Sequence, residues 1–125
     1  MTNSETVQAI YGAFSEGDME KMASLFSDDW VGVVPEGMPN SGTFHGAGDF
    51  IQNFLSHFPT VWPDFGMEPI ALYESGDTVF FHHKITAGGN TTEGIHMLVI
   101  ENGKCKSWRP FDDTAALIAA DQSQK

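Results

Sequence analysis

Four segments with the composition of β-strands follow one another over residues 65–110. They are FGMEPIALYE, TVFFHHKITA, TTEGIHMLVI and CKSWRP, and the turns between them are SGD, GGN and ENGK. Strands separated by such short, glycine-containing turns pair as antiparallel hairpins. This half of the chain is therefore predicted to form a four-stranded antiparallel meander, which must bury one face against other elements.

The first half of the chain carries the elements that can cover this sheet. Ser4 can cap a first helix, and Asp18 can cap a second over DMEKMASLF, which the acidic pair Asp28 and Asp29 should close. An apolar stripe predicts a third helix, which Pro59 should end. The stripe consists of Phe50, Ile51, Phe54, Leu55 and Phe58. Three helices are thus expected before the meander.

The remaining segments complete an α+β domain. WVGVV at 30–34 is a predicted strand, 35–42 a loop, and TAALIAADQ after Asp112 and Asp113 a last helix. We expect a single domain over residues 1–125, in which a curved antiparallel sheet forms a cone covered by three helices, with a short C-terminal helix. The interior of such a cone is expected to be apolar.

The charge of the chain restricts its partners. The formal net charge is −11, from 17 acidic residues against six Lys and Arg, which argues against binding to nucleic acid or to an anionic membrane. A neutral small molecule is the ligand class that this charge favours. MTNSETVQAI lacks the basic flank and apolar core of a secretory signal, so a cytoplasmic protein is expected. Cys105 is the only cysteine, which excludes a zinc site built from cysteines.

Four pieces of the sequence resemble one superfamily. They are SEGDMEKMASLFSDD, GTFHGAGDFIQNFLSHFP, ESGDTVFF and ENGKCKSWRPFDDTAAL. Together with the order of elements, they resemble the nuclear transport factor two-like superfamily, which includes ketosteroid isomerases and SnoaL-like polyketide cyclases. The resemblance spans nearly the whole chain and implies the cone-shaped fold, but this fold hosts enzymes and non-enzymes alike.

The resemblance also implies roles for individual residues. The general base of ketosteroid isomerases corresponds here to Val34, which cannot act as a base. Their acid that polarises the substrate oxygen falls near His96. The acid/base aspartate of SnoaL-like cyclases lies four residues after the last strand's tryptophan, which points from Trp108 to Asp112. Asp112 as acid and base, and His96 as donor to the substrate oxygen, are the implied catalytic residues, without a cofactor.

Asp112 also has a simpler interpretation. Pro110 should stop the last strand, and an aspartate directly before a helix is an ordinary N-cap. If the strand stays regular, its alternation places Asp112 on the same inward face as Trp108. Both interpretations stay open at this point, and they are compatible if Asp113 caps the helix while Asp112 faces the cavity.

The histidines of the meander offer a third catalytic side chain. His96 shares a face with apolar neighbours, so it is either a core histidine with satisfied nitrogens or a catalytic one. His82 and His83 point to opposite faces. The apolar pattern favours His83 as the inward residue, and the superfamily's strand registration favours His82, which we select. One of them could bind a metal with His96 and a carboxylate, but no spacing demands it, so no metal is predicted.

These residues suggest a reaction. We expect a neutral, largely apolar carbonyl compound in the cone and a proton moved α to its carbonyl, as in an isomerase, cyclase or lyase. The apolar surroundings should raise the pKa of Asp112, and ionised Asp112 should raise the pKa of His96. The aromatic core shares a wall with any pocket. The predicted substrate-binding residues are Tyr11, Trp30, Phe54, Phe58 and Trp108.

A non-catalytic function is the alternative. The cone could hold a hydrophobic ligand without chemistry, or the sheet could pair with a second copy. The outward face of the meander is predicted to carry Phe81, Ile85, Met97 and Val99, and such a face supports a homodimer under either function.

Overall fold

The computed structural model describes residues 1–123 and confirms the α+β class. The helices are α1 (Asn3–Ser15), α2 (Met19–Ser24), α3 (Ala47–Asn53), the 3₁₀ turn η1 (Leu55–His57), α4 (Phe58–Val61) and α5 (Thr114–Ala119). The strands are β1 (Phe26–Val34), β2 (Gly42–His45), β3 (Gly66–Ser75), β4 (Thr78–Ala87), β5 (Asn90–Glu101) and β6 (Lys104–Phe111). No helix in the described part of the chain is long and apolar enough to span a membrane.

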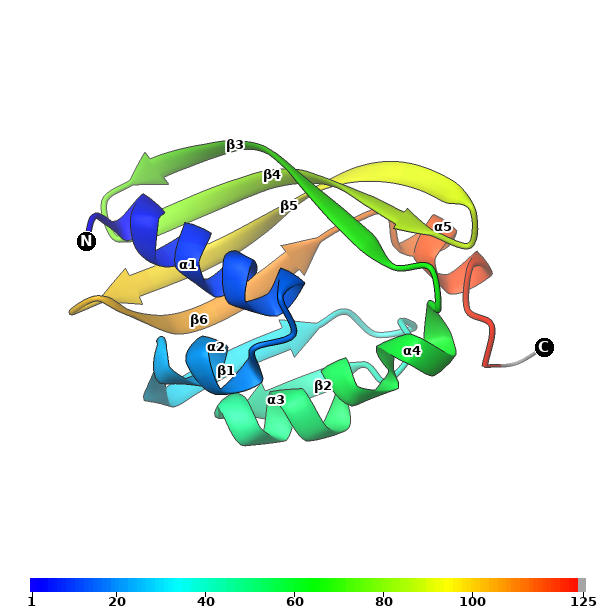
Figure 1. Cartoon of the computed structure of the whole chain (residues 1–125), viewed down its shortest axis with the longest axis horizontal. Helices are drawn as coiled ribbons and strands as arrows, with labels where there is room; N and C mark the ends of the chain where they lie inside the picture. Colours follow the sequence, from blue (N-terminus) through cyan, green and yellow to red (C-terminus); the bar gives the residue numbers. More distant parts are fainter. Residues whose placement is uncertain (124–125) are drawn as a thin grey trace.

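The six strands form one curved sheet in the order β2-β1-β6-β5-β4-β3. The meander β3 to β6 is antiparallel throughout, as predicted, whereas β1 pairs with β6 in parallel. In Figure 1 the sheet curves from β3 at the top to β2 at the bottom, with α1 crossing in front of it. Because α1 packs against all four meander strands, its side chains reach the interior of the curve.

The helices differ from the sequence prediction at several ends. Thr2, not Ser4, caps α1, because its side chain accepts from the Glu5 amide and Glu5 bonds back to complete a capping box. Ser4 instead donates to Glu74 on β3. The strand β1 begins at Phe26, so the acidic pair that was expected to close α2 lies within a strand.

The predicted third helix is divided into α3, the 3₁₀ turn η1 and α4. Phe54 has φ −125° and ψ −64°, so α3 ends before it, and Pro59 lies in the first turn of α4 rather than ending a helix. A proline ring clashes with the carbonyl four residues earlier in a continuous helix, which is at Leu55 here. The chain interrupts the helix at that point and restarts it, where the missing N–H of Pro59 has no cost.

A β-bulge sets which side chains of β6 face inward. Val99 pairs with Ser107, but Ile100 pairs with Cys105, so one extra residue is inserted around Lys106. Cys105 and Trp108 therefore both point into the core, although they are three residues apart. After the bulge the strand is regular.

The last strand also continues further than expected. Pro110 pairs with His96 inside β6, which runs on to Phe111, so the prediction that the proline stops the strand was wrong.

The inward face of β4 also differs from the prediction. Phe81 and Ile85 are each 3% exposed and belong to the core, so their predicted place on the outward face was wrong. Met97 and Val99 do lie on the outward face of β5, where they are half-buried. The misplacement of Phe81 and Ile85 has one origin. Choosing His82 as the inward residue assigned all the side chains of β4 to the wrong face.

Candidate functional site

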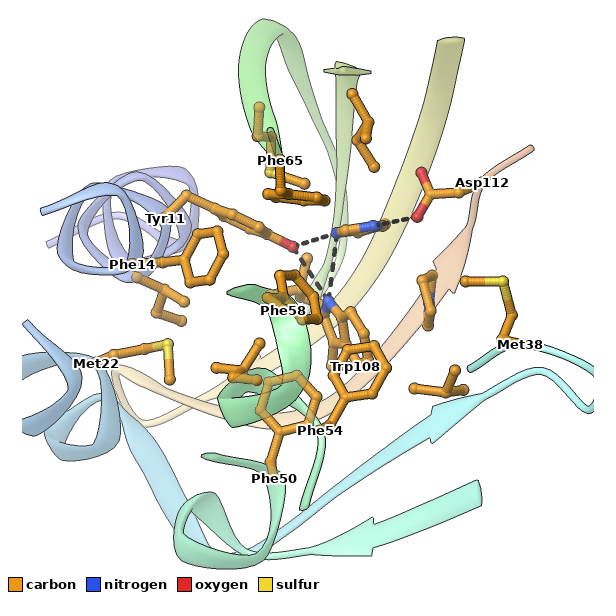
Figure 2. A pocket seen from close by; sticks show the side chains of 18 of the residues that line it. Tyr11, Phe14, Met22, Met38, Phe50, Phe54, Phe58, Phe65, Trp108 and Asp112 are labelled. Atoms are coloured by element: carbon orange, nitrogen blue, oxygen red, sulfur yellow. Dashed lines mark hydrogen bonds and ion pairs between the residues drawn. The ribbon is translucent and has the colours of Figure 1, made fainter. Parts of the chain in front are cut away.

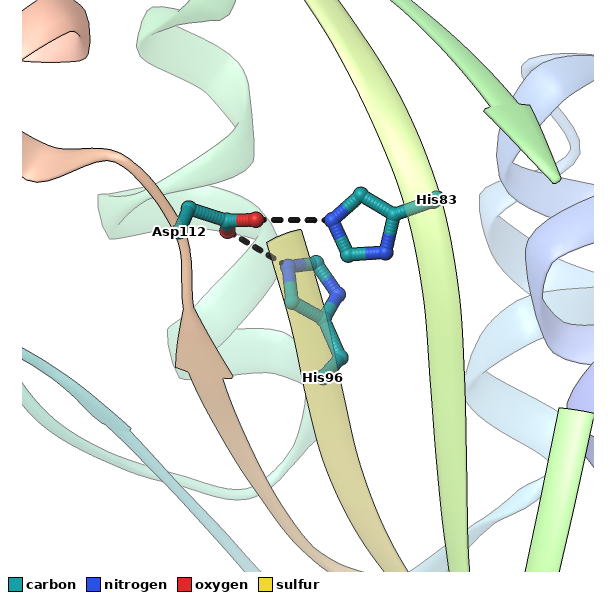
Figure 3. A group of neighbouring side chains, drawn as sticks. All are labelled: His83, His96 and Asp112. Carbon is teal, nitrogen blue, oxygen red and sulfur yellow. Dashed lines mark hydrogen bonds and ion pairs between the residues drawn. The ribbon is translucent and has the colours of Figure 1, made fainter. Parts of the chain in front are cut away.

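Three ionisable side chains from neighbouring strands meet inside the curve of the sheet. Asp112, directly after β6, faces both His83 on β4 and His96 on β5 (Figure 3). The Nε2 atom of each imidazole is 2.7 Å from a different carboxylate oxygen. The two histidine side chains are 0% and 5% exposed and that of Asp112 is 8% exposed, so water contributes little to this cluster.

A glycine makes room for the carboxylate. Gly94 pairs with His83 across β4 and β5, and a Cβ built on Gly94 would lie 1.9 Å from Oδ1 of Asp112. Any larger residue would displace the carboxylate. The sequence offers a signal that was not used, because a glycine inside a strand often marks a close approach of other groups.

His82 is not part of this cluster, so its assignment to the site was wrong. It lies on the outward face of β4, where its Nε2 is 3.4 Å from Oε2 of Glu93 and its side chain is 27% exposed. The apolar pattern of the strand indicated His83 correctly. Residues next to each other in a strand point to opposite faces, so His83 occupies the inward position that was assigned to His82.

The two candidate roles of the acidic pair are divided between its members. Asp113 accepts a hydrogen bond from the Ala116 amide and caps α5. Asp112 makes no cap and turns to the two histidines instead. The compatible interpretation of the sequence is the one that the structure shows.

The hydrogen-bond partners of His83 fix the protons on one side of the cluster. Its Nδ1 lies 2.9 Å from the carbonyl oxygen of Phe81, which can only accept, so Nδ1 carries a proton. Its Nε2 lies 2.7 Å from Oδ1 of Asp112, and a hydrogen bond of this length requires a further proton on one of the two atoms, because both would otherwise be acceptors. His83 and Asp112 together are therefore neutral, whichever of them holds that proton.

The partners of His96 fix the other side. The indole N–H of Trp108 donates to the Tyr11 hydroxyl oxygen at 3.1 Å and approaches His96 Nδ1 at 3.4 Å. With its oxygen accepting from Trp108, Tyr11 donates its own proton to His96 Nδ1 at 2.6 Å. His96 is thus neutral and donates its Nε2 proton to Asp112. A continuous chain runs from Tyr11 through His96 and Asp112 to His83.

The surroundings shift the pKa values of Asp112 and His96 in directions opposite to those expected from the sequence. Burial disfavours ionised Asp112, but the facing His96 and His83 hold the pKa of its carboxyl well below the ordinary value. Burial lowers the pKa of His96, and the Asp112 charge only partly offsets this effect. Both directions are opposite to those expected from the sequence, because two imidazoles share one carboxylate in a dry site. Burial raises the pKa of Tyr11 well above the ordinary value.

An apolar cavity of about 80 Å³ is lined by Tyr11, His96 and Asp112 of this hydrogen-bonded chain (Figure 2). Of the predicted substrate-binding residues, Tyr11, Phe54, Phe58 and Trp108 line it. Trp30 does not, because it is fully buried behind the wall, stacked on Phe26 with a centroid distance of 4.6 Å. Further lining residues that the sequence did not single out include Phe14, Met22, Met38, Phe50, Phe65 and Met67.

A larger groove lies outside this cavity. It runs between α1 and β3 and has a volume of about 930 Å³. Four half-buried residues line both spaces and form the wall between them, namely Tyr11, Phe14, Phe65 and Met67. A known benzene-binding cavity measures about 150 Å³, so a ligand ring would require this wall to shift toward the groove.

The same cluster contains metal-ligating atom types. His83, His96 and Asp112 offer ligand atoms within 4.8 Å of one another. A histidine that binds a metal through Nε2 usually donates its Nδ1 proton to an acceptor. His83 does so, whereas Nδ1 of His96 accepts from Tyr11 and faces the Trp108 N–H. The surroundings of His96 therefore favour a hydrogen-bonded chain over a metal centre.

The sequence matches one protein-family model over residues 7–108, that of the SnoaL-like domain. The chain belongs to the SnoaL-like family. No curated protein matches this SnoaL-like domain with significance. The match and the curved sheet agree with the nuclear transport factor two-like fold that the resemblance implied.

Solved structures support the assignment of this SnoaL-like domain. A nuclear transport factor two-like protein of unknown function from Burkholderia pseudomallei is 26% identical, with a TM-score of 0.83 and coverage of 96% of this chain and 97% of that one. TerC, co-crystallized with polyporic acid, is 29% identical, with a TM-score of 0.82 and coverage of 94% and 96%. A putative ketosteroid isomerase from Kribbella flavida is 17% identical, with a TM-score of 0.74 and coverage of 88% and 76%, and shares the fold.

Proposed function

We propose that this SnoaL-like domain is a cofactor-independent enzyme that moves a proton in a small, neutral, largely apolar carbonyl compound. The reaction is of the isomerase, cyclase or lyase type. The observation that carries the proposal is the chain from Tyr11 through His96 to Asp112, whose three members line an apolar cavity and which ends in a buried, neutral pair with His83. Such a chain has the components of general acid–base catalysis.

The proposed step transfers two protons in concert. The C–H bond α to the substrate carbonyl breaks, its proton goes to the Tyr11 oxygen, and its electron pair stays on the substrate as an enolate. The former Tyr11 proton moves to Nδ1 of His96, which becomes an imidazolium and keeps its Nε2 proton toward Asp112. Tyr11 then gives one proton to another atom of the substrate and regains its own from Nδ1 of His96, which yields a rearranged product.

The electrostatics explain why the transfer is coupled. Burial opposes ionisation of Tyr11 alone, so the phenol must gain one proton as it gives up another. Asp112 is held ionised and is a weak base near neutral pH. Its proposed role is therefore to orient His96 and to stabilise the imidazolium, in the manner of the aspartate of a Ser-His-Asp triad.

The relatives are consistent with a small organic substrate. The family and superfamily include isomerases and cyclases, and TerC was co-crystallized with polyporic acid. The aromatic walls of the cavity suit an apolar molecule. The ionised carboxylate and the chain's net charge of −11 disfavour an anionic one.

Deuterium exchange into ketones tests the proposal without a known substrate. We expect the protein to accelerate α-deuteration of at least one of cyclopentanone, cyclohexanone, acetophenone and indanone in D₂O, followed by NMR. Tyr11→Phe should lower this rate by roughly 10² to 10⁴-fold, the usual contribution of a positioned acid–base group. The matched control is Tyr73→Phe, because Tyr73 is 58% exposed on β3 and should exchange ketones at the wild-type rate.

The pH dependence of this exchange follows from His96. Only neutral His96 can accept the Tyr11 proton, and its pKa is lowered by burial. Activity should therefore persist below the ordinary histidine pKa of about 6.5 and fall only at more acidic pH. Exchange no faster than in buffer for every ketone, or unchanged exchange in Tyr11→Phe, would contradict the proposal.

An exposed apolar patch favours a second function as a dimerisation module. Ile95 on β5 and Phe111 on β6 are paired neighbours, 39% and 56% exposed, next to Met97 on the outward face of the sheet. We propose that this patch joins two copies in a homodimer, whether or not the cavity is catalytic.

Light scattering should give a mass twice the 13.7 kDa of the chain at micromolar concentration. The double variant Ile95→Glu and Phe111→Glu should be monomeric, because charges on a buried patch oppose association. Ile118→Glu, which changes an exposed apolar residue of α5, should leave the dimer intact. A wild-type mass near that of one chain would exclude the homodimer.

A further inference from the structure

The side-chain hydrogen-bond donors around the cavity are all engaged with protein acceptors. Five lining residues carry an N–H, O–H or S–H group, namely Tyr11, Trp62, His96, Cys105 and Trp108. Tyr11 donates to His96, His96 donates to Asp112, and Trp108 donates to Tyr11. Trp62 donates to the Leu117 carbonyl at 2.9 Å, and Cys105 donates to the Ser107 carbonyl at 3.3 Å. Burial raises the pKa of Cys105 to about 12, so its thiol keeps the proton.

Acceptor capacity remains at the same wall. The Tyr11 oxygen has two lone pairs and accepts one hydrogen bond, from Trp108, among the residues that the structure describes. Each Asp112 oxygen takes one imidazole, although a carboxylate can accept about four hydrogen bonds in all. Pro110, another lining residue, has no N–H to donate. The polar edge of the cavity can therefore accept hydrogen bonds, while its side-chain donors are occupied.

This imbalance selects the ligand. A ligand whose polar atom only accepts, such as a ketone oxygen, would lose its water and find no free side-chain donor, and an unsatisfied buried group is costly. A ligand with an O–H would satisfy the free lone pair of Tyr11. We infer that the cavity binds a neutral hydroxylated molecule, a phenol or an enol, which donates its O–H to the Tyr11 oxygen.

The inference refines the proposed function and rests on the same cavity. If both hold, the enol form of the substrate is the form that binds best, and its hydroxyl extends the chain to five linked groups: ligand, Tyr11, His96, Asp112 and His83. Linked hydrogen bonds polarise one another in a site of low dielectric constant. The aromatic walls at Phe54 and Phe58 suit the flat ring of a phenol.

Three small aromatic compounds of similar size test the inference by calorimetry on the whole protein. Phenol can donate a hydrogen bond, benzaldehyde can only accept one, and fluorobenzene is nearly apolar. We expect phenol to bind about 5-fold more tightly than either of the others, since one net hydrogen bond is worth about 1 kcal/mol. In a purely apolar cavity the order would be reversed, because phenol loses more hydration than fluorobenzene. Fluorobenzene or benzaldehyde binding as tightly as phenol would overturn the inference.

Tyr11→Phe provides a second measurement. Without the phenolic oxygen, the Trp108 N–H loses its 3.1 Å acceptor but still faces Nδ1 of His96 at 3.4 Å, and that nitrogen loses its own donor. The wall then lacks the oxygen that accepts a ligand O–H. Phenol should therefore lose its advantage over fluorobenzene in this variant, whereas the affinity of fluorobenzene should change little. An unchanged preference for phenol in Tyr11→Phe would show that the Tyr11 oxygen is not its acceptor.

The two proposals fail in different assays. Ketone exchange that depends on Tyr11, combined with a preference for fluorobenzene over phenol, would overturn only the ligand class. A preference for phenol, combined with no exchange of any ketone, would overturn only the proton-transfer function.

Discussion

Asp112→Asn should fold normally and lose proton transfer. The amide oxygen of asparagine can accept the Nε2 proton of His96, and its NH₂ can donate to Nε2 of His83, which is free to accept because the His83 proton lies on Nδ1. An N–H of the amide thus takes the place of the proton that His83 and Asp112 share in the native protein. Because asparagine carries no negative charge, it cannot stabilise the imidazolium form of His96. Ketone exchange should therefore fall roughly 10⁴-fold, as when the aspartate of a Ser-His-Asp triad is replaced by asparagine.

Asp112→Ala is the contrasting variant. It leaves two buried imidazole Nε2 atoms without partners and should cost about 3 to 5 kcal/mol in the free energy of unfolding. Asp112→Asn should cost about 1 kcal/mol or less by the same urea denaturation. Full exchange activity in Asp112→Asn would show that the carboxylate serves only to pack the two histidines.

Gly94→Ala should damage both stability and activity by moving Asp112. The added Cβ would lie 1.9 Å from Oδ1 and 3.1 Å from the Cα of Asp112, so both the carboxylate and the end of β6 must shift. Overpacking of this kind costs about 1 to 3 kcal/mol in unfolding free energy, and the displaced carboxylate should also lose its geometry toward His96. Urea denaturation and ketone exchange measure the two effects.

Two further variants isolate the clash. Gly66→Ala on β3 places a Cβ with no neighbour within 4 Å and should change stability by about 0.5 kcal/mol or less. In the Asp112→Ala background the carboxylate is absent, so Gly94→Ala should cost less than it does in the wild type. If the two substitutions changed the unfolding free energy by purely additive amounts, Gly94→Ala would destabilise the strand itself rather than clash with Asp112.

The sequence predicts the meander well because its signals are local. Alternating strands and glycine turns repeat at short intervals, and each turn determines the pairing of its own hairpin. The choice between His82 and His83 is different, because a period of two residues fixes which side chains share a face but not which face is buried. The apolar neighbours Val79 and Phe81 contained the answer, since they lie on the face of His83.

The proton chain was harder to predict because its members are distant in the sequence. Tyr11 and His96 are 85 residues apart, and Trp108 and Tyr11 are 97 apart. Their contact depends on how α1 crosses the sheet, which no local pattern encodes. The predicted directions of the pKa shifts were wrong for the same reason. The prediction paired Asp112 with His96 alone, whereas in the structure two imidazoles share its carboxylate.

The bulge near Lys106 gives β6 an odd count between its two inward residues, Cys105 and Trp108. If the same residues ran as a regular strand with no bulge at Lys106, the side chains beyond it would exchange faces relative to Cys105. Arg109 and Phe111 would then enter the interior, and Trp108 and Asp112 would face solvent. The bulge thus sets the parity of the strand, so which side chains line the cavity depends on a count of backbone residues as well as on the residues themselves.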